Sequence, residues 1–298
     1  MTTVTHVLSI PLSPRDKRAA DKLQAKLETL CAEDSTLGVE MGPVGEVILR
    51  GIGEPQLEWV VGHLQRQPEL AFKVGMPEVQ YRETITRTID WTYTHKQPDP
   101  AQYAVLRIQL TPLIRGSGIE VEIRCPSDEI PTHIPLPDFQ RAIDAGVHAA
   151  CKAGVVDGYP LTDLQAIILD AGWHDEDSTA EAFEIAARMG LREALPRARP
   201  WLLEPVMVVV ALTPEEFLSD VIADFNQRRG KVQGLAMHGV IAAITATVPF
   251  ANLAGYENDL RAMTQRRGAC TMAFDHYGEV PPRLDAEDSL PIGTALRA

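Results

Sequence analysis

Residues 206–230 read VMVVVALTPEEFLSDVIADFNQRRG, and this stretch carries the signals of a strand followed by a helix. The run Val206–Leu212 is continuously apolar and rich in valine, which favours a buried strand. Thr213-Pro214-Glu215-Glu216 has the composition of a helix start, with Thr as N-cap, Pro at the first helical position and two acids near the positive end of the helix dipole. The sequence therefore predicts a strand over 206–212 and a helix over 214–227.

The surrounding residues extend this pair of elements into a longer pattern. Strands are predicted near 232–237, 241–248 and 269–274, with a helix over 252–264. The same order occurs at the start of the chain, where Ser13-Pro14 begins the first helix. Its predicted elements are a strand at 4–10, a helix carrying Ala19, Leu23, Leu27 and Leu30 on one face, strands at 37–41 and 46–50, a helix at 55–66 and a strand at 71–74. The β-α-β-β-α-β order, met twice, predicts two ferredoxin-like split βαβ sandwiches.

A block of different composition separates the two repeats. It has strand-like residues at 79–91, 103–110 and 119–125, helical patterns at 138–153 and 178–195, and a buried apolar run at 164–169. The predicted fold class is therefore α+β. The predicted domains are residues 1–76, 77–199 and 200–284, followed by a tail at 285–298 with little apolar content.

Composition narrows the class of protein. The chain has 298 residues with 28 Lys plus Arg against 41 Asp plus Glu, so the formal net charge is 28 − 41 = −13, which argues against unselective binding of nucleic acid. Four scattered cysteines without C-x-x-C spacing argue against a zinc site or a disulfide framework. No secretory signal or membrane-length apolar run occurs, so we expect a cytoplasmic protein without a membrane partner.

Motifs for catalysis are missing. The Gly-Lys pair at 230–231 lacks the rest of a phosphate-binding loop, Gly51-Ile52-Gly53 lacks the third glycine of a dinucleotide site, and there is no H-E-x-x-H or G-x-S-x-G. The histidines, among them His133 and His148, show no ligand-like pairing and are interpreted as surface or capping residues. We therefore expect no catalytic, cofactor or metal site in this chain.

Several strings, taken in order, resemble the C-terminal half of bacterial elongation factor G, its domains III, IV and V. Residues 51–58, GIGEPQLE, resemble the family's GMGELHLE, and residues 74–85, VGMPEVQYRETI, resemble VGKPQVAYRETI. Residues 173–178, WHDEDS, are similar to YHEVDS, and 154–160 with Asp163 also match. The last domain contributes LEPVM at 203–207, DVIADFNQRRG at 220–230, and 264–268 ahead of FDHY at 274–277.

The resemblance implies both a fold and a role. The fold would be two ferredoxin-like sandwiches flanking a middle domain of the ribosomal-protein-S5-domain-2-like α+β type. The role would be to place the middle-domain tip in the decoding region of the ribosome during translocation of tRNA and mRNA, or during ribosome recycling. Partners would be the ribosome, its rRNA and the tRNA–mRNA pair, together with an N-terminal GTPase domain that would hold GTP and Mg. The chain itself would be a monomer and not an enzyme.

The same resemblance points to residues that contact RNA. One tip loop would present Trp173, His174 and Asp175, and the other would contain Gln97 and Gln102. This second loop reads KQPDPAQYA at 96–104, one residue shorter than the family's KQSGGSGQYG and without glycine, which favours a divergent paralogue. Taken alone, the histidine fits a solvated turn, and Asp177 or Ser178 fits a helix cap.

A local excess of positive charge gives a second candidate surface. Residues 227–267 contain six cations and two acids, a net charge of 6 − 2 = +4. The resemblance implies contact with large-subunit rRNA through Arg228, Arg229, Lys231, Arg266 and Arg267, although cations near a helix C-terminus also stabilise its dipole. Two other functions remain open: a GTPase-less paralogue that acts as a regulatory or ribosomal-protection module, and, least favoured, an enzyme that uses scattered carboxylates.

Overall fold

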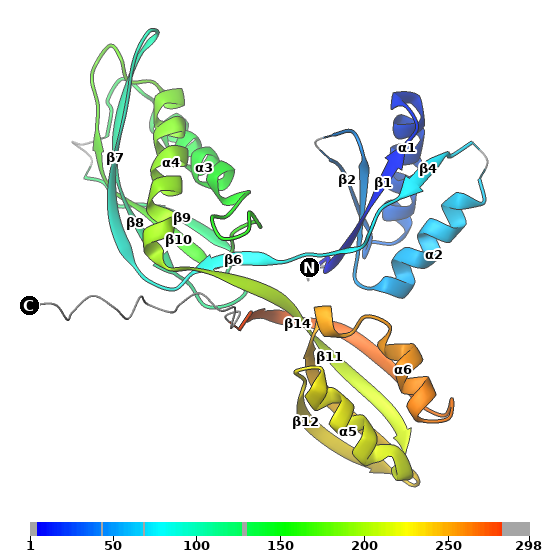
Figure 1. The fold of residues 1–298 in the computed structure, drawn as a ribbon. Helices are drawn as coiled ribbons and strands as arrows, with labels where there is room; N and C mark the ends of the chain where they lie inside the picture. The colour runs from blue at the N-terminus through cyan, green and yellow to red at the C-terminus, as the bar shows by residue number, and fades with distance from the viewer. Residues whose placement is uncertain (1–4, 43, 68, 127–129, 282–298) are drawn as a thin grey trace, which may run out of the picture.

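The computed structural model describes residues 5–42, 44–67, 69–126 and 130–281. It contains three hydrophobic clusters, one in each of three domains arranged along the chain (Figure 1). The middle domain stands apart from the other two, and a long hairpin projects from it (Figure 1). Within the described residues, no helix is both long and apolar enough to span a membrane.

The first domain is a four-stranded antiparallel sheet with a short fifth strand at its side. The order β2-β3-β1-β4, with β5 paired to β1, is that of a ferredoxin-like fold, as predicted. The helix predicted to begin at Ser13-Pro14 starts later, because Pro14 still pairs with Phe72 in the sheet and Asp16 caps the helix. The elements are β1 (Leu8–Pro14), α1 (Lys17–Glu33), β2 (Gly38–Met41), β3 (Val47–Gly51), α2 (Glu54–Gln65), β4 (Phe72–Val74) and β5 (Glu78–Val79).

The last domain repeats this topology, with the strand order β12-β13-β11-β14. The predicted helix start at Thr213-Pro214 was wrong, since Pro214 pairs with Ile241 and the buried Thr213 hydroxyl donates to the Pro214 carbonyl. A 3-10 turn, Glu215–Phe217, precedes the α-helix. The elements are β11 (Pro200–Pro214), α5 (Leu218–Gln227), β12 (Lys231–His238), β13 (Ile241–Pro249), α6 (Tyr256–Met263) and β14 (Ala269–Glu279).

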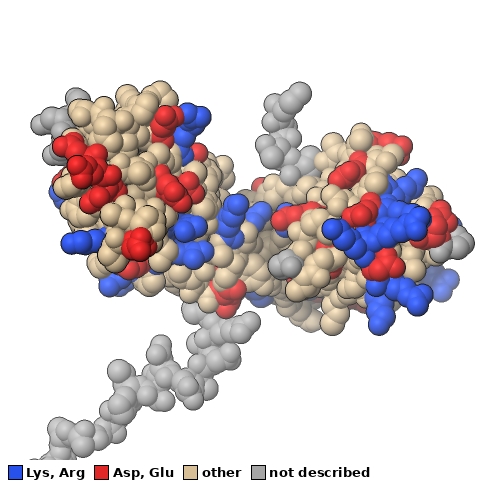
Figure 2. Space-filling view, turned by 90° about the horizontal axis from the view of Figure 1, so that it is seen from above, with Lys and Arg blue, Asp and Glu red and all other residues tan. Residues whose placement is uncertain are grey.

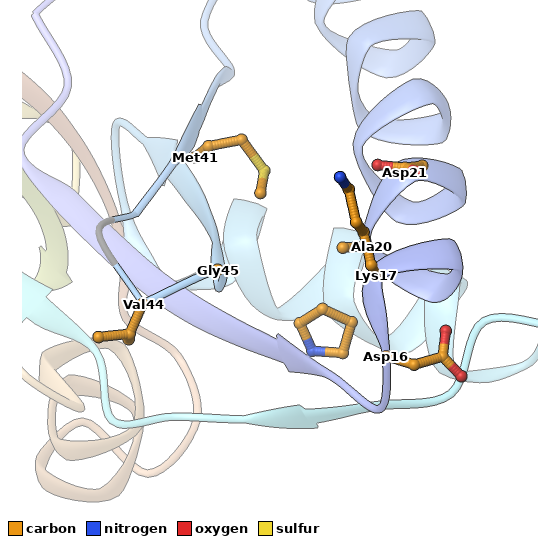
Figure 3. Close-up of a pocket in the computed structure, with 8 residues that line it drawn as sticks. Asp16, Lys17, Ala20, Asp21, Met41, Val44 and Gly45 are labelled. Atoms are coloured by element: carbon orange, nitrogen blue, oxygen red, sulfur yellow. The ribbon is translucent and has the colours of Figure 1, made fainter.

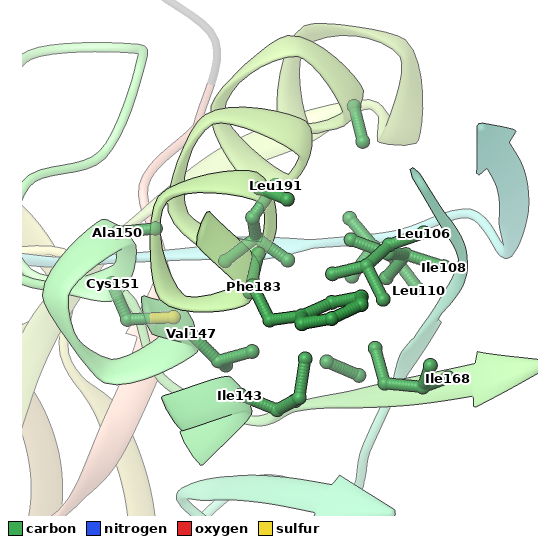
Figure 4. Close-up of a cluster of buried hydrophobic side chains, with 14 of the residues drawn as sticks. Leu106, Ile108, Leu110, Ile143, Val147, Ala150, Cys151, Ile168, Phe183 and Leu191 are labelled. Atoms are coloured by element: carbon green, nitrogen blue, oxygen red, sulfur yellow. The ribbon is translucent and has the colours of Figure 1, made fainter. Parts of the chain in front are cut away.

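The middle domain packs two helices on one face of a mixed sheet. The sheet order is β7-β8-β10-β9, with β9 and β10 parallel. Figure 4 shows the Phe183 ring of α4 reaching toward aliphatic side chains of the sheet, and this ring meets Phe139 of α3 edge-on at 4.9 Å. Gly146 lets the helices approach closely, since a Cβ there would lie 2.3 Å from the Glu184 carbonyl oxygen. The elements are β6 (Arg82–Ile85), β7 (Ile89–Pro98), β8 (Ala101–Pro112), β9 (Ile119–Ile123), α3 (Leu136–Cys151), β10 (Leu164–Gly172) and α4 (Ala180–Ala194).

The segments that lead into and out of the middle domain run side by side. Strand β6 pairs antiparallel with the start of β11, from Arg82 opposite Leu203 to Ile85 opposite Pro200. Strand β6 thereby becomes a fifth strand of the sheet of the last domain. The predicted tail at 285–298 lies outside the described residues.

Candidate nucleic-acid interface

The projecting tip of the middle domain consists of a hairpin and a loop. Strands β7 and β8 pair as far as Pro98 and Ala101, so Asp99 and Pro100, joined by a cis peptide bond, form the turn. The side-chain amide of Gln97 donates from Nε2 to the Asp99 carbonyl at 3.1 Å. His95 and Gln102 are hydrogen-bonded across the strands at 3.0 Å. The hairpin is therefore ordered by cross-strand contacts up to its turn.

The loop at 173–178 is tied to this hairpin. The Tyr103 amide donates to the Asp177 carbonyl at 2.9 Å, and the buried Ser178 hydroxyl donates to the Tyr103 carbonyl at 2.6 Å. The same hydroxyl accepts from the His174 amide at 2.8 Å. Helix α4 is capped by Thr179, which accepts from the Ala182 amide, and not by Asp177 or Ser178 as predicted. The two predicted tip loops therefore do lie together, with Ser178 joining them.

A third segment, around His133, also belongs to the tip, and the sequence patterns did not indicate this. His133 is exposed, in agreement with its interpretation as a surface or capping residue, and it donates from Nε2 to the Ser178 carbonyl at 2.7 Å. Its ring lies 5.3 Å from that of Trp173, which packs against the core of the domain. Trp173 is therefore half-buried and supports the loop. A lone histidine before Ile-Pro gives no sequence signal for such a long-range contact.

The exposed part of the tip is acidic, with one prominent imidazole. The His174 side chain is 61% exposed, and its Nδ1 lies 3.7 Å from an Asp177 carboxylate oxygen. Asp175 and Glu176 are also exposed, as is Asp99 on the hairpin. Carboxylates repel phosphate, so this tip suits hydrogen bonding to ribose or base edges more than general attraction to a nucleic-acid backbone.

Most of the cations in the predicted basic strip, residues 227–267, form ion pairs with acidic side chains. Arg228 bonds Asp224 at 2.8 Å and Asp259 at 2.7 Å, and only 17% of its side chain is exposed. Arg229 pairs with the buried Glu204, and Arg267 pairs with Glu216.

Arg261 likewise pairs with Glu257. Of the six cations in the predicted strip, Lys231 and Arg266 are the two without an ion pair to any described residue, and both are exposed. The net charge of +4 therefore overstates the positive charge that this region can offer to a phosphate.

A hollow in the first domain offers no alternative site. It has a volume of about 450 Å³ and lies between the start of α1 and the turn after β2 (Figure 3). Its described lining combines Lys17, Asp16 and Asp21 with small or apolar residues, without a nucleophile beside a base. Nor do the described residues contain a group of three or more His, Cys, Asp or Glu that could hold a metal ion.

Comparison with known families identifies the type of chain. Residues 5–76 match the model of Elongation Factor G, domain III, residues 77–199 that of Elongation factor G, domain IV, and residues 201–287 that of the Elongation factor G C-terminus. These matches place the chain among translation elongation factors. It belongs to the elongation factor G family, as the predicted motifs indicated, and corresponds to the C-terminal part of its relatives.

Individual relatives agree with this assignment. The chain is 39% identical over 290 residues to elongation factor G of Hyphomonas neptunium, and 38% identical over 290 residues to that of Ruegeria pomeroyi. Each alignment covers 96% of this chain but only 40% of the relative. A crystal structure of a protein from Thermus thermophilus matches with a TM-score of 0.71 and 31% identity, over 95% of this chain and 42% of the other.

Proposed function

We propose that this chain is the ribosome-binding part of an elongation factor G-like translation factor. In this role the middle-domain tip enters the decoding region while tRNA and mRNA move, or while ribosomes are recycled. The observation that carries the proposal is the tie between hairpin and loop through Ser178, which holds the exposed His174 in place. An imidazole held in this way donates to ribose or base atoms at a small cost in entropy.

In this proposal GTP is hydrolysed by a domain other than the three described here. The matched family models are those of domains III and IV and the C-terminal domain. We therefore propose that GTP and Mg are bound by the nucleotide-binding domain of this family and that the present chain contributes positioning. We also propose that it acts as a cytoplasmic monomer with rRNA and the tRNA–mRNA pair as partners.

Co-sedimentation with ribosomes tests this role. The full chain is expected to pellet with ribosomes at low salt, and His174→Ala is expected to weaken binding about 3- to 10-fold, the effect of losing roughly one hydrogen bond. His148→Ala is the matched control, because this histidine is also exposed but lies on α3. If neither the wild-type chain nor its variants bind at low salt, the proposal is wrong.

A regulatory or ribosomal-protection role is the second candidate. It is favoured by the Asp99-Pro100 turn, which replaces the glycine-rich loop of the family and adds a negative charge at the tip. A full-length elongation factor G should displace this chain from ribosomes in either case. The two roles separate when translocation is measured with the chain in excess and the complete factor then raised to saturation. Slowing by simple competition is reversed by the added factor, whereas a regulatory module changes the rate at saturation as well.

A further inference from the structure

Helix α1 and the residue before its cap present an exposed basic face. Arg18, Lys22 and Lys26 follow one another at spacings of four residues within α1, which places them along one side of the helix, and Arg15 lies just before the helix cap, Asp16. Arg15, Arg18 and Lys22 are exposed, and Lys26 is half-buried. We call these four residues the α1 basic face.

The cations of this face have no ion-pair partners within the described part of the chain, unlike Arg228, Arg229, Arg261 and Arg267 of the last domain. Among the acids close to this face in sequence, Asp16 accepts from the Ala19 amide as the helix cap, and Glu28 accepts from the Gln24 side chain. Residues 15–26 have five cations and two acids, a net charge of 5 − 2 = +3 in a chain of net charge −13. Figure 2 shows Lys and Arg side chains gathered over the part of the molecule that holds α1.

Stability of the helix does not account for this arrangement. The first turn of α1 contains no acid and its last turn no base, which is the reverse of what the helix dipole favours. Every other α-helix in the described residues has at least one acid in its first turn. Cations four residues apart on one face also repel each other. Such a face is best explained by a partner that supplies negative charge.

The surroundings of the face favour a phosphate backbone over a protein. Protein interfaces rely on buried aromatic or aliphatic anchors, and no large apolar side chain is exposed among residues 15–36. The exposed Met41 and Val44 lie by the flank of α1 that carries Lys17, Ala20 and Asp21, where they line the hollow of the first domain. Aromatic rings for stacking bases are also missing from those residues. Arg18 and Lys26 are eight residues apart, about 12 Å along the helix axis, so the face can meet several phosphates.

We propose that the α1 basic face binds the phosphate backbone of structured RNA, independently of base sequence. The choice of RNA rests on the proposed function, since ribosomal RNA is the polyanion that a ribosome-binding chain meets. This contact would orient the first domain, while the tip of the middle domain makes a separate contact.

The test measures binding of the full chain to a labelled RNA duplex of about 20 base pairs over a range of salt concentrations. The variant Arg15→Gln/Arg18→Gln/Lys22→Gln is compared with a control, Arg141→Gln/Lys152→Gln/Arg192→Gln. The control removes three exposed cations of the middle domain, so both variants have the same net charge. The α1 variant is expected to bind at least about tenfold more weakly, with the slope of log affinity against log salt reduced by about 2 to 3. The control is expected to bind like the wild type.

Four outcomes would overturn the inference: no duplex binding by the wild type at low salt, equal losses in both variants, a larger loss in the control, or equally tight binding of poly-glutamate. Circular dichroism establishes that the variants are folded. Ribosome co-sedimentation of the same proteins tests the proposed function separately. If the chain binds the duplex through α1 but does not bind ribosomes, the proposed function is wrong and the inference stands. If ribosomes bind the α1 variant as well as the wild type, and neither protein binds the duplex, the inference is wrong and the proposed function stands.

Discussion

At the scale of single residues, the buried Glu83 explains why two distant motifs occur together. Its side chain is fully buried, and its two carboxylate oxygens accept from the amides of Val155, Val156, Asp157 and Tyr159 at 2.7–3.1 Å. A Cβ on Gly154 would lie 2.0 Å from Oε2 of Glu83, so this position requires glycine. The carboxylate thus orders the loop that follows α3.

Replacing this carboxylate should be costly. Glu83→Gln puts an amide NH₂ group among backbone donors, so we expect the free energy of unfolding to fall by about 2–4 kcal/mol. Urea denaturation followed by circular dichroism measures this loss. Glu78→Gln, at an exposed position of β5, is the control and should change stability by less than about 0.5 kcal/mol. Equal effects of the two substitutions would contradict the assigned role of Glu83.

His6 makes stability depend on pH. Burial, followed by the charge of Arg50, lowers the pKa of His6 below its ordinary value of 6.5. Below pH 6.5 the unfolded chain therefore binds a proton at this position more readily than the folded chain does, and unfolding is favoured. The stabilisation is complete above about pH 6.5 and is lost as the pH falls toward the pKa of the folded state.

We therefore expect the urea midpoint of the wild type to fall between pH 7 and pH 5 more steeply than that of His6→Gln. His63→Gln removes an exposed histidine of α2 and serves as the control for losing one imidazole. Parallel pH profiles for the wild type and His6→Gln would refute this prediction.

At the scale of elements, the inverted charges of α1 predict that stability and RNA binding change in opposite directions. Arg18→Glu puts an acid in the first turn and removes a cation of the α1 basic face, so we expect unfolding to cost about 0.3–1 kcal/mol more while affinity for the RNA duplex falls. Glu33→Lys, in the last turn, should stabilise by a similar amount without weakening RNA binding. Urea denaturation and duplex titration measure the two effects. Destabilisation by Arg18→Glu would show that the helix dipole does not set the stability of α1.

At the tip, the neighbouring hydroxyls of Ser178 and Thr179 are expected to differ in their effect on amide exchange at Tyr103. Ser178→Ala removes the bonds to Tyr103 and His174, so we expect the Tyr103 amide, which donates to Asp177, to exchange with solvent at least about fivefold faster. Thr179→Ala removes only the cap of α4, with a loss of about 1 kcal/mol and little change at Tyr103. Hydrogen exchange read by NMR or mass spectrometry checks both, and a greater effect of Thr179→Ala on Tyr103 would contradict the assignment.

The order of elements was predictable from apolar periodicity, but two helix starts were not. Ser13-Pro14 and Thr213-Pro214 both suit the first turn of a helix, yet each proline closes a strand, paired with Phe72 and Ile241 respectively. The local signal is the same for both states, and the strand partner that decides between them lies 27 residues or more away in sequence. His133 was missed for the same reason, since its partners Trp173 and Ser178 are remote in sequence.

At the scale of the whole molecule, charge counted along the chain did not predict charge on the surface. The window at 227–267 had a net charge of +4, but its arginines also meet acids outside it, such as Glu204 and Glu216. The two loops expected at the tip, by contrast, do lie together, joined through Ser178. A charge count is informative only when the fold shows which side chains remain unpaired, as on α1.

Contact between the first and last domains predicts coupled stability. Val7, just before β1, is fully buried in the hydrophobic cluster of the last domain, and Phe250 packs against the clusters of both. We expect Val7→Ala to lose about 1–3 kcal/mol and to accelerate amide exchange in both β3 and β13. Val74→Ala, at a 39% exposed position, is the control. Faster exchange in one domain alone would show that Val7 does not couple them.

The pairing of β6 with β11 gives the middle domain the topology of an insertion. Ile85 and Pro200 are register partners, so the 114 residues between them leave and return at neighbouring points of one antiparallel ladder. A short turn from Ile85 to Pro200 would close the ladder without the middle domain. The sheet of the last domain therefore carries the middle domain at the ladder of β6 and β11, and Glu83 of β6 ties the two together there through the loop after α3.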